Sequence, residues 1–487
     1  MVSFAPACAA VLGTGCVGSE PKRMTHGTGL VPSGSGKKPS DNVVVIHVDD
    51  LGWCDMGCMG SPVYETPHLD ALAASGTRYT DAYAAGSLCA PSRACMLTGS
   101  QPSRHGVYTV VKNRGKKEHW KIIPEKNSHY LAEDYPTLGT VLTGAGIANG
   151  TVGKWHIGVR VPSHGFKEGK WGGYLGMPIN YFAPFKLGFL PKDVPEGSYL
   201  PTYIRQAGVE FLERHRNERF FLYFATYLPH DEIANEDGST LTAPEAVVRK
   251  YERKIAAMKK AGKDLKGHDN PVYAAMIEET DRSVGAIIDK LDKLGLRKNT
   301  LVLFISDNGG VDKYTDMGSL RGDKCTLYEG GIRVPMIASM PGKIPAGTVS
   351  KEPVYGLDFY PTICSFMGIK PTDPAKVDGE DLTDLIFRGK SLGVRNLFWN
   401  FPVYNRPGDP TRCPRSAMRR GDWKIHHRYE DNGYELYNLK DDIGESRDLA
   451  QSRPKVLNMM RKQLEACYER FGAVKKLQPN PEYTADQ

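Results

Sequence analysis

The sequence has little of three features that would each point to a particular class of protein. No stretch approaches the roughly 20 consecutive apolar residues that a transmembrane helix requires. The 10 cysteines among 487 residues are scattered and include no Cys-x-x-Cys pair, which argues against a disulfide scaffold and a structural zinc site and leaves room for about one or two disulfides. Neither sign of charge dominates, because the formal net charge is only +7. We therefore expect a globular protein whose mild basicity is compatible with an acidic substrate.

The first 40 residues differ in composition from the rest of the chain. Residues 1–21 contain a short run of small apolar residues ending at Cys16, in the manner of a bacterial export signal whose cysteine receives a lipid anchor. The segment lacks a basic start, and Gly13 stands where such a signal prefers leucine. Residues 17–40 are rich in Gly, Ser, Pro and Lys, which is typical of a flexible tether. The favoured location is the periplasm, the extracellular space or the outer surface.

Four apolar segments each end in a polar cluster. Residues 43–48 are an almost continuous run of β-branched residues, typical of a strand covered on both faces in a parallel sheet. Similar segments lie within 150–158, 219–230 and 299–310, and amphipathic helical patterns such as 66–75 and 273–295 separate them. Alternating strands and helices predict an α/β fold, with a large, mainly parallel sheet sandwiched by helices.

The polar residues that follow these strands are expected to share one edge of the sheet. They are Asp49, Asp50, Lys154, His156, His230, Asp307 and Asn308. Ligands of open α/β sheets bind beyond the carboxyl ends of the strands, so these side chains predict a cleft. Three aspartates there would repel one another unless a cation neutralised them. Because carboxylate and amide oxygens suit a hard cation, we expect the aspartates and Asn308 to bind calcium rather than zinc.

Permanent positive charges accompany the carboxylates. Arg93, Lys154 and Lys324, together with His156 and His230, would place positive charge and hydrogen-bond donors around a bound oxyanion. Lone lysines are more often solvated surface residues, and only their position relative to the strands favours a site. A divalent metal combined with permanent cations suits a strongly anionic group such as sulfate or phosphate.

The segment SLCAPSRACMLTG, residues 87–99, places Cys89 two positions before a proline. A nucleophilic cysteine needs a base that generates its thiolate. No histidine lies near Cys89 in the sequence, although distant ones could fold back. We therefore interpret Cys89 as a precursor, from which the working group is made after translation.

Several motifs resemble those of the type I, formylglycine-dependent sulfatases, an arylsulfatase-like family of the alkaline phosphatase superfamily. CAPSRACMLTG (89–99) resembles the first sulfatase signature and GTVGKWHIG (150–158) the second. VDDLG and SDNGG resemble the metal-binding segments of the family. SRHGVYT, YEGGIRVP, DFYPTI and residues 419–442 are similar to further landmarks in the same order. The resemblance covers roughly residues 41–472 and implies a hydrolase of sulfate monoesters.

The resemblance also implies a chemical role for Cys89. A formylglycine-generating enzyme would oxidise it to formylglycine, with Pro91 and Arg93 as recognition elements. One hydroxyl of the hydrated aldehyde would attack sulfur, and the second would later lose its proton and expel sulfate. A plain serine or cysteine has no second hydroxyl for that exit. The helix that follows Cys89 would point its N-terminus at the anion.

The resemblance assigns roles to the other clustered residues as well. One calcium ion would be held by Asp49, Asp50, Asp307, Asn308 and the modified Cys89. Arg93 would steady the formylglycine diol, and Lys154 and Lys324 would bind sulfate oxygens. His156 would be the base and His230 the acid, although these two roles could be exchanged. In one departure from the family, Cys325 follows Lys324 where many relatives have glycine.

The C-terminal part is expected to form a smaller α+β domain. We predict an N-terminal segment at 1–40, a catalytic domain at 41–390 and a C-terminal subdomain at 391–487. Residues 416–439 predict antiparallel strands with turns at Gly421–Asp422 and Asn432–Gly433. A final helix is predicted to begin near Pro454, which suits a first helical turn.

The substrate is less clearly indicated. Residues 111–126 and 247–267 are basic, but apolar residues at helical spacing in the second stretch favour the solvated face of a helix over a grip on a polyanion. Family analogy favours a sulfated carbohydrate as substrate. No nucleic-acid partner is expected, and the sequence leaves the oligomeric state open. The loop residues Trp120, His164, Trp171 and Tyr174 could contact a sugar ring or simply pack.

Two alternative functions stay open. A phosphonate or phosphodiester hydrolase of the same superfamily would share much of the site, although its phosphatase branches tend to use Thr or Ser and two zinc ions. A catalytically inactive protein that binds sulfated glycans is expected to lack a nucleophile or a metal ligand, and all of these are present in the sequence.

Overall fold

The computed structural model describes residues 41–110, 117–233, 240–405 and 408–484. The predicted export signal, the Cys16 anchor and the tether lie outside these residues, as do residues 111–116 of the first basic stretch. In the described part of the chain, no helix combines the length and the apolar character needed to cross a membrane. The eight cysteines described are free thiols.

The main sheet has eight strands in the order β5-β4-β6-β1-β7-β8-β2-β9. All neighbours run parallel except β8, which is antiparallel to both β7 and β2. The predicted α/β fold with a mainly parallel sheet is therefore confirmed. The strands are β1 (Asn42–Val48), β2 (Thr77–Tyr79), β4 (Ala148–Gly153), β5 (Glu168–Lys170), β6 (Phe220–Ala225), β7 (Thr300–Ser306), β8 (Met336–Ser339) and β9 (Thr348–Ser350).

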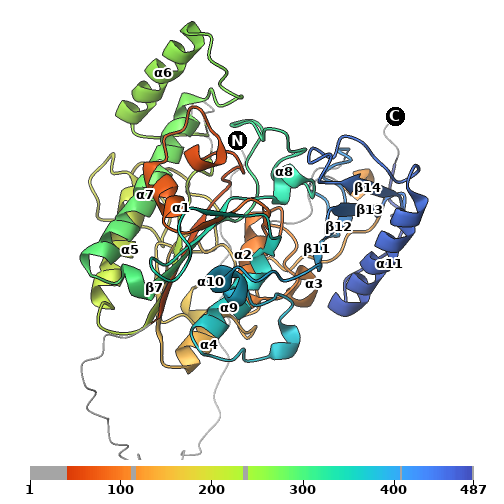
Figure 1. Ribbon diagram of the computed structural model, residues 1–487, viewed down its shortest axis with the longest axis horizontal. Helices are drawn as coiled ribbons and strands as arrows, with labels where there is room; N and C mark the ends of the chain where they lie inside the picture. The colour runs from red at the N-terminus through yellow and green to blue at the C-terminus, as the bar shows by residue number, and fades with distance from the viewer. Residues whose placement is uncertain (1–40, 111–116, 234–239, 406–407, 485–487) are drawn as a thin grey trace, which may run out of the picture. The chain divides into compact units, whose positions relative to one another are not determined.

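Helices cover both faces of this sheet (Figure 1). Val44 and Ile46 of β1 enter one core, and Val43 and Val45 enter the other, because successive side chains of a strand point to opposite faces. The first core is covered by α1 (Pro67–Ala74), α5 (Leu200–Arg214), α6 (Glu245–Lys260) and α7 (Pro271–Lys293). The second is covered by α2 (Cys89–Thr98), α4 (Leu138–Gly144), α9 (Phe359–Phe366) and α10 (Thr383–Arg388).

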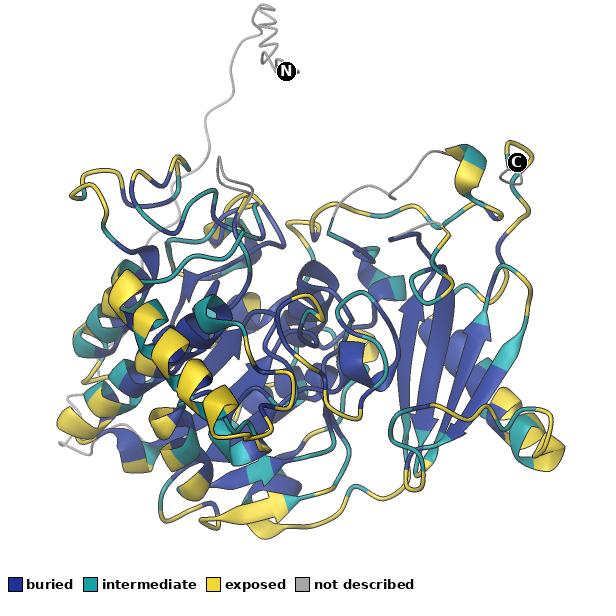
Figure 2. Ribbon diagram, turned by 90° about the horizontal axis from the view of Figure 1, so that it is seen from above, coloured by how far each residue is buried: buried dark blue, intermediate teal, exposed yellow. Residues whose placement is uncertain are grey.

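Shorter elements connect these layers. They are β3 (Ala82–Tyr83) and β10 (Val354–Tyr355), which pair in parallel, the helices α3 (Pro102–His105) and α8 (Glu329–Ile332), and the 3-10 turns Gly57–Met59, Lys117–His119, Pro162–His164, Arg297–Asn299, Gly356–Asp358 and Pro374–Lys376. The basic helix α6 buries Val247, Tyr251 and Ile255, and Figure 2 shows the outer faces of the surface helices exposed. The charges of α6 thus belong to its solvated face, as the helical spacing predicts.

The C-terminal residues form a second, antiparallel sheet of four strands in sequence order. Its elements are β11 (Asn396–Phe401), β12 (Arg415–Arg420), β13 (Trp423–Arg428), β14 (Tyr434–Asn438) and the helix α11 (Pro454–Phe471). The predicted turns lie between these strands, and Gly421 and Asn432 have φ of 58° and 53°. Trp399 fastens β11 to the main body, because its Nε1 donates to the Ala84 carbonyl at 2.8 Å. The predicted boundary at 390–391 falls between α10 and β11.

Candidate active site

The carboxyl ends of β1, β4, β6 and β7 gather the predicted polar residues at one edge of the sheet. Asp49 and Asp50 follow β1, and Asp307 and Asn308 follow β7. The Asp50 amide donates to Asp307 Oδ1 at 3.2 Å, and Asn308 Nδ2 donates to Asp50 Oδ1 at 2.7 Å. Lys154 follows β4, and its amide donates to the Ala225 carbonyl at the end of β6. Parallel pairing of these strands is what brings residues more than 250 positions apart into contact.

Each carboxylate in this pocket contacts a permanent cation. Lys154 Nζ lies 2.5 Å from Asp49 Oδ2, and Lys324 Nζ lies 2.6 Å from Asp50 Oδ2. Arg93 places Nε 2.9 Å and Nη2 2.7 Å from Asp307 Oδ2. The three aspartates are buried, as are Arg93 and Lys154. Each carboxylate therefore has a cationic partner before any metal or substrate is added.

Burial and these neighbours shift the pKa values of the acids in opposite directions. Burial raises the pKa of Asp49 well above its usual range, although Lys154 opposes this, and the Asp307 carboxylate raises it further. Burial would also raise the pKa of Asp307, but Arg93 and Lys154 hold it below its usual range. A bound cation at these oxygens would stabilise the ionised form of both acids.

The donor set fits a hard cation such as Ca²⁺. Asp49 Oδ1 and Asn308 Oδ1 are buried and have no hydrogen-bond partner, and unpaired buried oxygens are unusual in folded proteins. The ligand atoms of Asp49, Cys89 and Asp307 lie within 4.8 Å of one another. Carboxylate and amide oxygens are the ligands that calcium prefers. The residues predicted to bind calcium therefore lie together.

Cys89 is the first residue of α2 and is 2% exposed. The loop that carries Lys324 is attached to the segment before it, because the Cys325 amide donates to the Ser87 carbonyl at 2.9 Å. Cys325 has a φ of 77°, a left-handed conformation that glycine adopts more easily than cysteine.

The two predicted histidines differ in electrostatic surroundings, which lower the pKa of one and raise that of the other. Burial, together with Lys154 and Arg93, lowers the pKa of His156 well below its usual range, and its Nδ1 is buried without a hydrogen-bond partner. The ring lies against Gly176, where a Cβ would come within 2.1 Å of it. The fold thus requires glycine at that position and holds a neutral imidazole with a free nitrogen.

His230 is oriented by a residue that the sequence analysis did not single out. Its Nδ1 lies 2.9 Å from Asp231 Oδ1, and the other carboxylate oxygen of Asp231 accepts from Tyr314 Oη at 2.8 Å. The opposite nitrogen, Nε2, lies 2.9 Å from Lys324 Nζ. Asp231 directly follows His230, so an acidic neighbour was visible in the sequence, but its orientation was not.

Two more unpredicted residues support Arg93. Arg93 Nη1 donates to Tyr223 Oη at 3.2 Å, and the same hydroxyl lies 2.7 Å from His47 Nδ1. Both residues are buried within the strands β6 and β1. A hydroxyl and an imidazole in otherwise apolar strands were the available signals, because a buried polar group needs a partner.

The loop residues considered for sugar contact have different environments. His164 is 1% exposed, and its Nε2 lies 3.1 Å from the Leu131 carbonyl. Trp120 stacks on Tyr404. Tyr174 is 42% exposed and packs edge-on against Phe189. His164 and Trp120 therefore serve packing, and Tyr174 stays accessible.

Comparison with known proteins decides the family. The sequence model of the Sulfatase family matches residues 41–369. The chain belongs to the sulfatase family. It is thus a sulfuric ester hydrolase of the alkaline phosphatase superfamily. A second family model, described as N-sulphoglucosamine sulphohydrolase, C-terminal, matches residues 321–470 of this sulfatase.

Individual relatives span most of this sulfatase. It is 32% identical over 399 residues to N-acetylgalactosamine-6-sulfatase of Mus musculus, covering 76% of this chain and 70% of the relative. It is 31% identical over 424 residues to arylsulfatase A of Homo sapiens, covering 79% and 74%. The crystal structure of Ps i-CgsB in complex with k-i-k-neocarrahexaose is similar with a TM-score of 0.72 and 26% identity, covering 93% of this chain and 96% of that one.

Proposed function

We propose that this sulfatase removes sulfate from a carbohydrate, using a formylglycine made from Cys89 and one bound Ca²⁺. The observation that carries the proposal is the position of Cys89. It lies at the first turn of a buried helix, with its sulfur within 4.8 Å of carboxylate oxygens of Asp49 and Asp307. A hydrated aldehyde made from Cys89 would place its two hydroxyls beside the residues that we propose as calcium ligands.

Asp49, Asp50, Asp307 and Asn308 would hold the calcium ion, which when bound supplies positive charge that polarises sulfate oxygens. The charges within the pocket favour a bound divalent ion together with an anionic substrate. The three carboxylates and the cations Arg93, Lys154 and Lys324 cancel, so an added divalent ion leaves an excess of positive charge. That excess would select an anionic ester over a neutral one.

The side chains of the pocket position the reacting groups. Arg93, which bonds Asp307 and Tyr223, would hold the oxidised residue 89 in place. One hydroxyl of its hydrated aldehyde would be the nucleophile, and the second would lose its proton and expel sulfate. Lys154 and Lys324 would turn part of their hydrogen bonding toward the sulfate oxygens. Both ammonium groups already lie in the pocket, so small rotations about their side-chain bonds suffice.

Proton transfer would fall to the two histidines. His156 would accept a proton, since burial and nearby cations keep its ring neutral and its Nδ1 is free. His230 would protonate the leaving oxygen, with Asp231 holding its Nδ1 and the Lys324 ammonium close to its Nε2. A positioned acid or base typically contributes about 10²–10⁴-fold to a rate.

The names of the relatives favour a sulfated carbohydrate as substrate. N-acetylgalactosamine-6-sulfatase acts on an amino sugar according to its name, and Ps i-CgsB was crystallised with a neocarrahexaose. A cleft of about 810 Å³ contains Tyr314, which contacts Asp231 beside His230. We place the sugar that leaves with the ester oxygen on the side of the pocket where Tyr314 and Asp231 lie.

The remaining partner would be a formylglycine-generating enzyme, which modifies Cys89. Export with a lipid anchor at Cys16 would bring the sulfatase to its substrate.

The proposal is tested by the mass of the peptide that contains residue 89, from protein expressed with and without a formylglycine-generating enzyme. Conversion of the thiol to the aldehyde predicts a loss of about 18 Da. The Cys89→Ala variant should keep the circular dichroism of the wild type and lose turnover of sulfated sugars. An unmodified thiol in an active enzyme, or comparable turnover by Cys89→Ala, would refute the mechanism.

The same preparations separate the alternatives. Faster hydrolysis of a phosphonate monoester than of sulfated sugars would favour the phosphonate hydrolase. Tight binding of sulfated sugars without turnover, in protein that carries the aldehyde, would favour the glycan-binding reading.

A further inference from the structure

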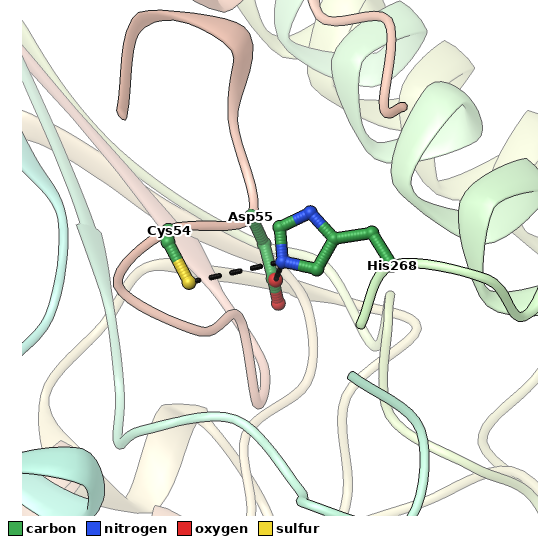
Figure 3. A group of neighbouring side chains, drawn as sticks. All are labelled: Cys54, Asp55 and His268. Carbon is green, nitrogen blue, oxygen red and sulfur yellow. Dashed lines mark hydrogen bonds and ion pairs between the residues drawn. The ribbon is translucent and has the colours of Figure 1, made fainter. Parts of the chain in front are cut away.

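A second group of metal-ligating side chains lies outside the sulfate pocket. Cys54 and Asp55 lie in the loop after β1, and His268 lies in the connection between α6 and α7. Their ligand atoms are within 4.8 Å of one another, and Figure 3 shows the thiol and the carboxylate both near the imidazole ring. Asp55 and His268 are fully buried, and Cys54 is half-buried. Two consecutive residues and a third one 214 positions from Cys54 thus bring sulfur, oxygen and nitrogen close together.

The thiol and the carboxylate approach the same nitrogen of His268. Cys54 Sγ lies 3.8 Å from Nε2, and Asp55 Oδ1 also lies 3.8 Å from Nε2. In a thiol-based catalytic triad the carboxylate would instead bond the nitrogen opposite the nucleophile and orient the ring. The arrangement therefore does not suit a nucleophilic cysteine. It suits three ligands around a shared ion.

His268 is already held in the orientation that a metal ligand needs. Its Nδ1 lies 2.8 Å from Ser61 Oγ, and its ring stacks on Tyr64 with centroids 4.5 Å apart and planes 14° apart. A proton on Nδ1 that is donated to Ser61 leaves the lone pair of Nε2 directed at the thiol and the carboxylate. Metal-binding histidines commonly donate their second nitrogen to such a partner, which fixes the ring.

Asp55 is held in a similar way and keeps an acceptor position. Its Oδ2 accepts from the Gly52 amide at 2.9 Å and from Tyr273 Oη at 2.8 Å. Its Oδ1, the oxygen that faces His268, accepts from Thr315 Oγ1 at 2.7 Å. A carboxylate oxygen has two lone pairs, so Oδ1 can bind a metal without giving up this bond.

We propose that Cys54, Asp55 and His268 bind a zinc-type transition-metal ion, with water as the fourth ligand. Mixed sulfur, nitrogen and oxygen ligands suit Zn²⁺, whereas Ca²⁺ prefers oxygen alone. Normal zinc bond lengths in a tetrahedron place such ligand atoms about 3.4–3.6 Å apart, so the 3.8 Å separations would close by only a few tenths of an ångström. A cleft of about 810 Å³ lies beside the group, since its lining includes Thr315, which donates to Asp55, and Asp316, whose carbonyl accepts from the Cys54 thiol at 3.1 Å.

The ion would join two segments directly and a third through Thr315, whose hydroxyl donates to Asp55. The loop after β1 carries Asp49 and Asp50, and the loop after β7 contains Thr315 and continues to Lys324. His268 adds the connection between the two helices. The site would thus stabilise the rim of the pocket, and its three ligands are not among the residues that line the cleft beside which we place the sugar. Because a cysteine binds such an ion as the thiolate, binding would release a proton.

Cobalt is a suitable probe, because a thiolate bound to Co²⁺ gives a charge-transfer absorption band. The titration uses full-length Cys89→Ala protein in excess Ca²⁺. The substitution removes the thiol of the other cysteine-containing group of metal-ligating side chains found among the described residues, and Ca²⁺ fills the oxygen-rich site. We expect one equivalent of Co²⁺ with a thiolate band that Zn²⁺ abolishes by displacement. Cys54→Ser in the same background should lose the band. Cys58→Ser, four residues further on and outside the group, should keep it.

A milder variant protects the test against misfolding. Ser61→Ala leaves all three ligands in place and should weaken Co²⁺ binding by about 10–100-fold, the range for lost partners of metal ligands. Circular dichroism checks the fold of every variant. The proposal is overturned if the Cys89→Ala protein gives no thiolate band, or if the band survives in Cys54→Ser. Since the readout is metal binding and not turnover, neither result depends on the sulfatase mechanism.

Discussion

Replacing Lys424 by methionine removes a buried cation from between two buried carboxylates. Lys424 Nζ lies 2.9 Å from Glu329 Oε1 and 3.1 Å from Glu445 Oε1, and all three side chains are 0% exposed. Lys424 belongs to β13 and Glu329 to α8, so the triad joins the C-terminal sheet to the main body. Removing one partner of a buried ion pair costs about 3–5 kcal/mol, because the other charge is left uncompensated.

Part of this cost depends on pH. Burial raises the pKa of Glu445 to about 7, against the opposing effect of Lys424, and Glu329 raises it further. Glu329 stays ionised, because Arg333 and Tyr83 also contact it. When folding raises the pKa of a carboxyl group, the folded protein becomes less stable as pH rises from the pKa of the unfolded state, 4.5, toward that of the folded state. Without Lys424 the pKa of Glu445 rises further. Protonation of Glu445 at low pH therefore stabilises the variant more than the wild type.

We therefore expect Lys424→Met to lower the free energy of unfolding by about 3–5 kcal/mol at pH 8. The loss should be smaller at pH 6, by about 1.4 kcal/mol for each pH unit over which Glu445 gains its proton. Urea unfolding followed by tryptophan fluorescence measures both values. Lys424→Met/Glu445→Gln, which removes the repelling charge, should recover much of the loss at pH 8. A loss below about 1 kcal/mol, an equal loss at both pH values, or no recovery would refute the reasoning.

Two further predictions concern the sulfate pocket. Asp307→Ala should reduce bound calcium, measured by elemental analysis, from one ion per chain to below about a tenth, because it removes a central carboxylate. Asp312→Asn, an exposed change in the same loop, should leave the calcium content unchanged, and unchanged calcium in Asp307→Ala would contradict the ligand assignment. His156→Gln should lower kcat on a sulfated sugar by about 10²–10⁴-fold with an unchanged circular dichroism spectrum. A loss smaller than about tenfold would remove His156 from proton transfer.

Local sequence patterns were sufficient for much of the architecture. The apolar run at 43–48 became β1, a strand buried on both faces, because such runs satisfy two cores at once. The turn residues Gly421 and Asn432 marked the hairpins of the second sheet through their positive φ. Pro454 marked the first turn of α11. In each case the information lies within a few residues, where steric preferences act directly.

The candidate site was visible because its chemistry is concentrated in short motifs at strand ends. Asp49 and Asp307 could be placed together once a parallel sheet was expected. Asp231, Tyr223 and His47 were missed, since their roles depend on which way a side chain points. A tyrosine in an apolar strand does not reveal that an arginine 130 positions away donates to it.

The sequence by itself determined the class of fold, the sulfatase motifs and the residues at the carboxyl ends of the strands. Tertiary structure alone decided the antiparallel insertion of β8 between β7 and β2. It also decided that Cys54 and Asp55 meet His268, more than 200 positions away, and that Lys424 lies between Glu329 and Glu445. The physical reason is that composition and periodicity act through near neighbours along the chain, whereas these contacts follow from how whole elements pack.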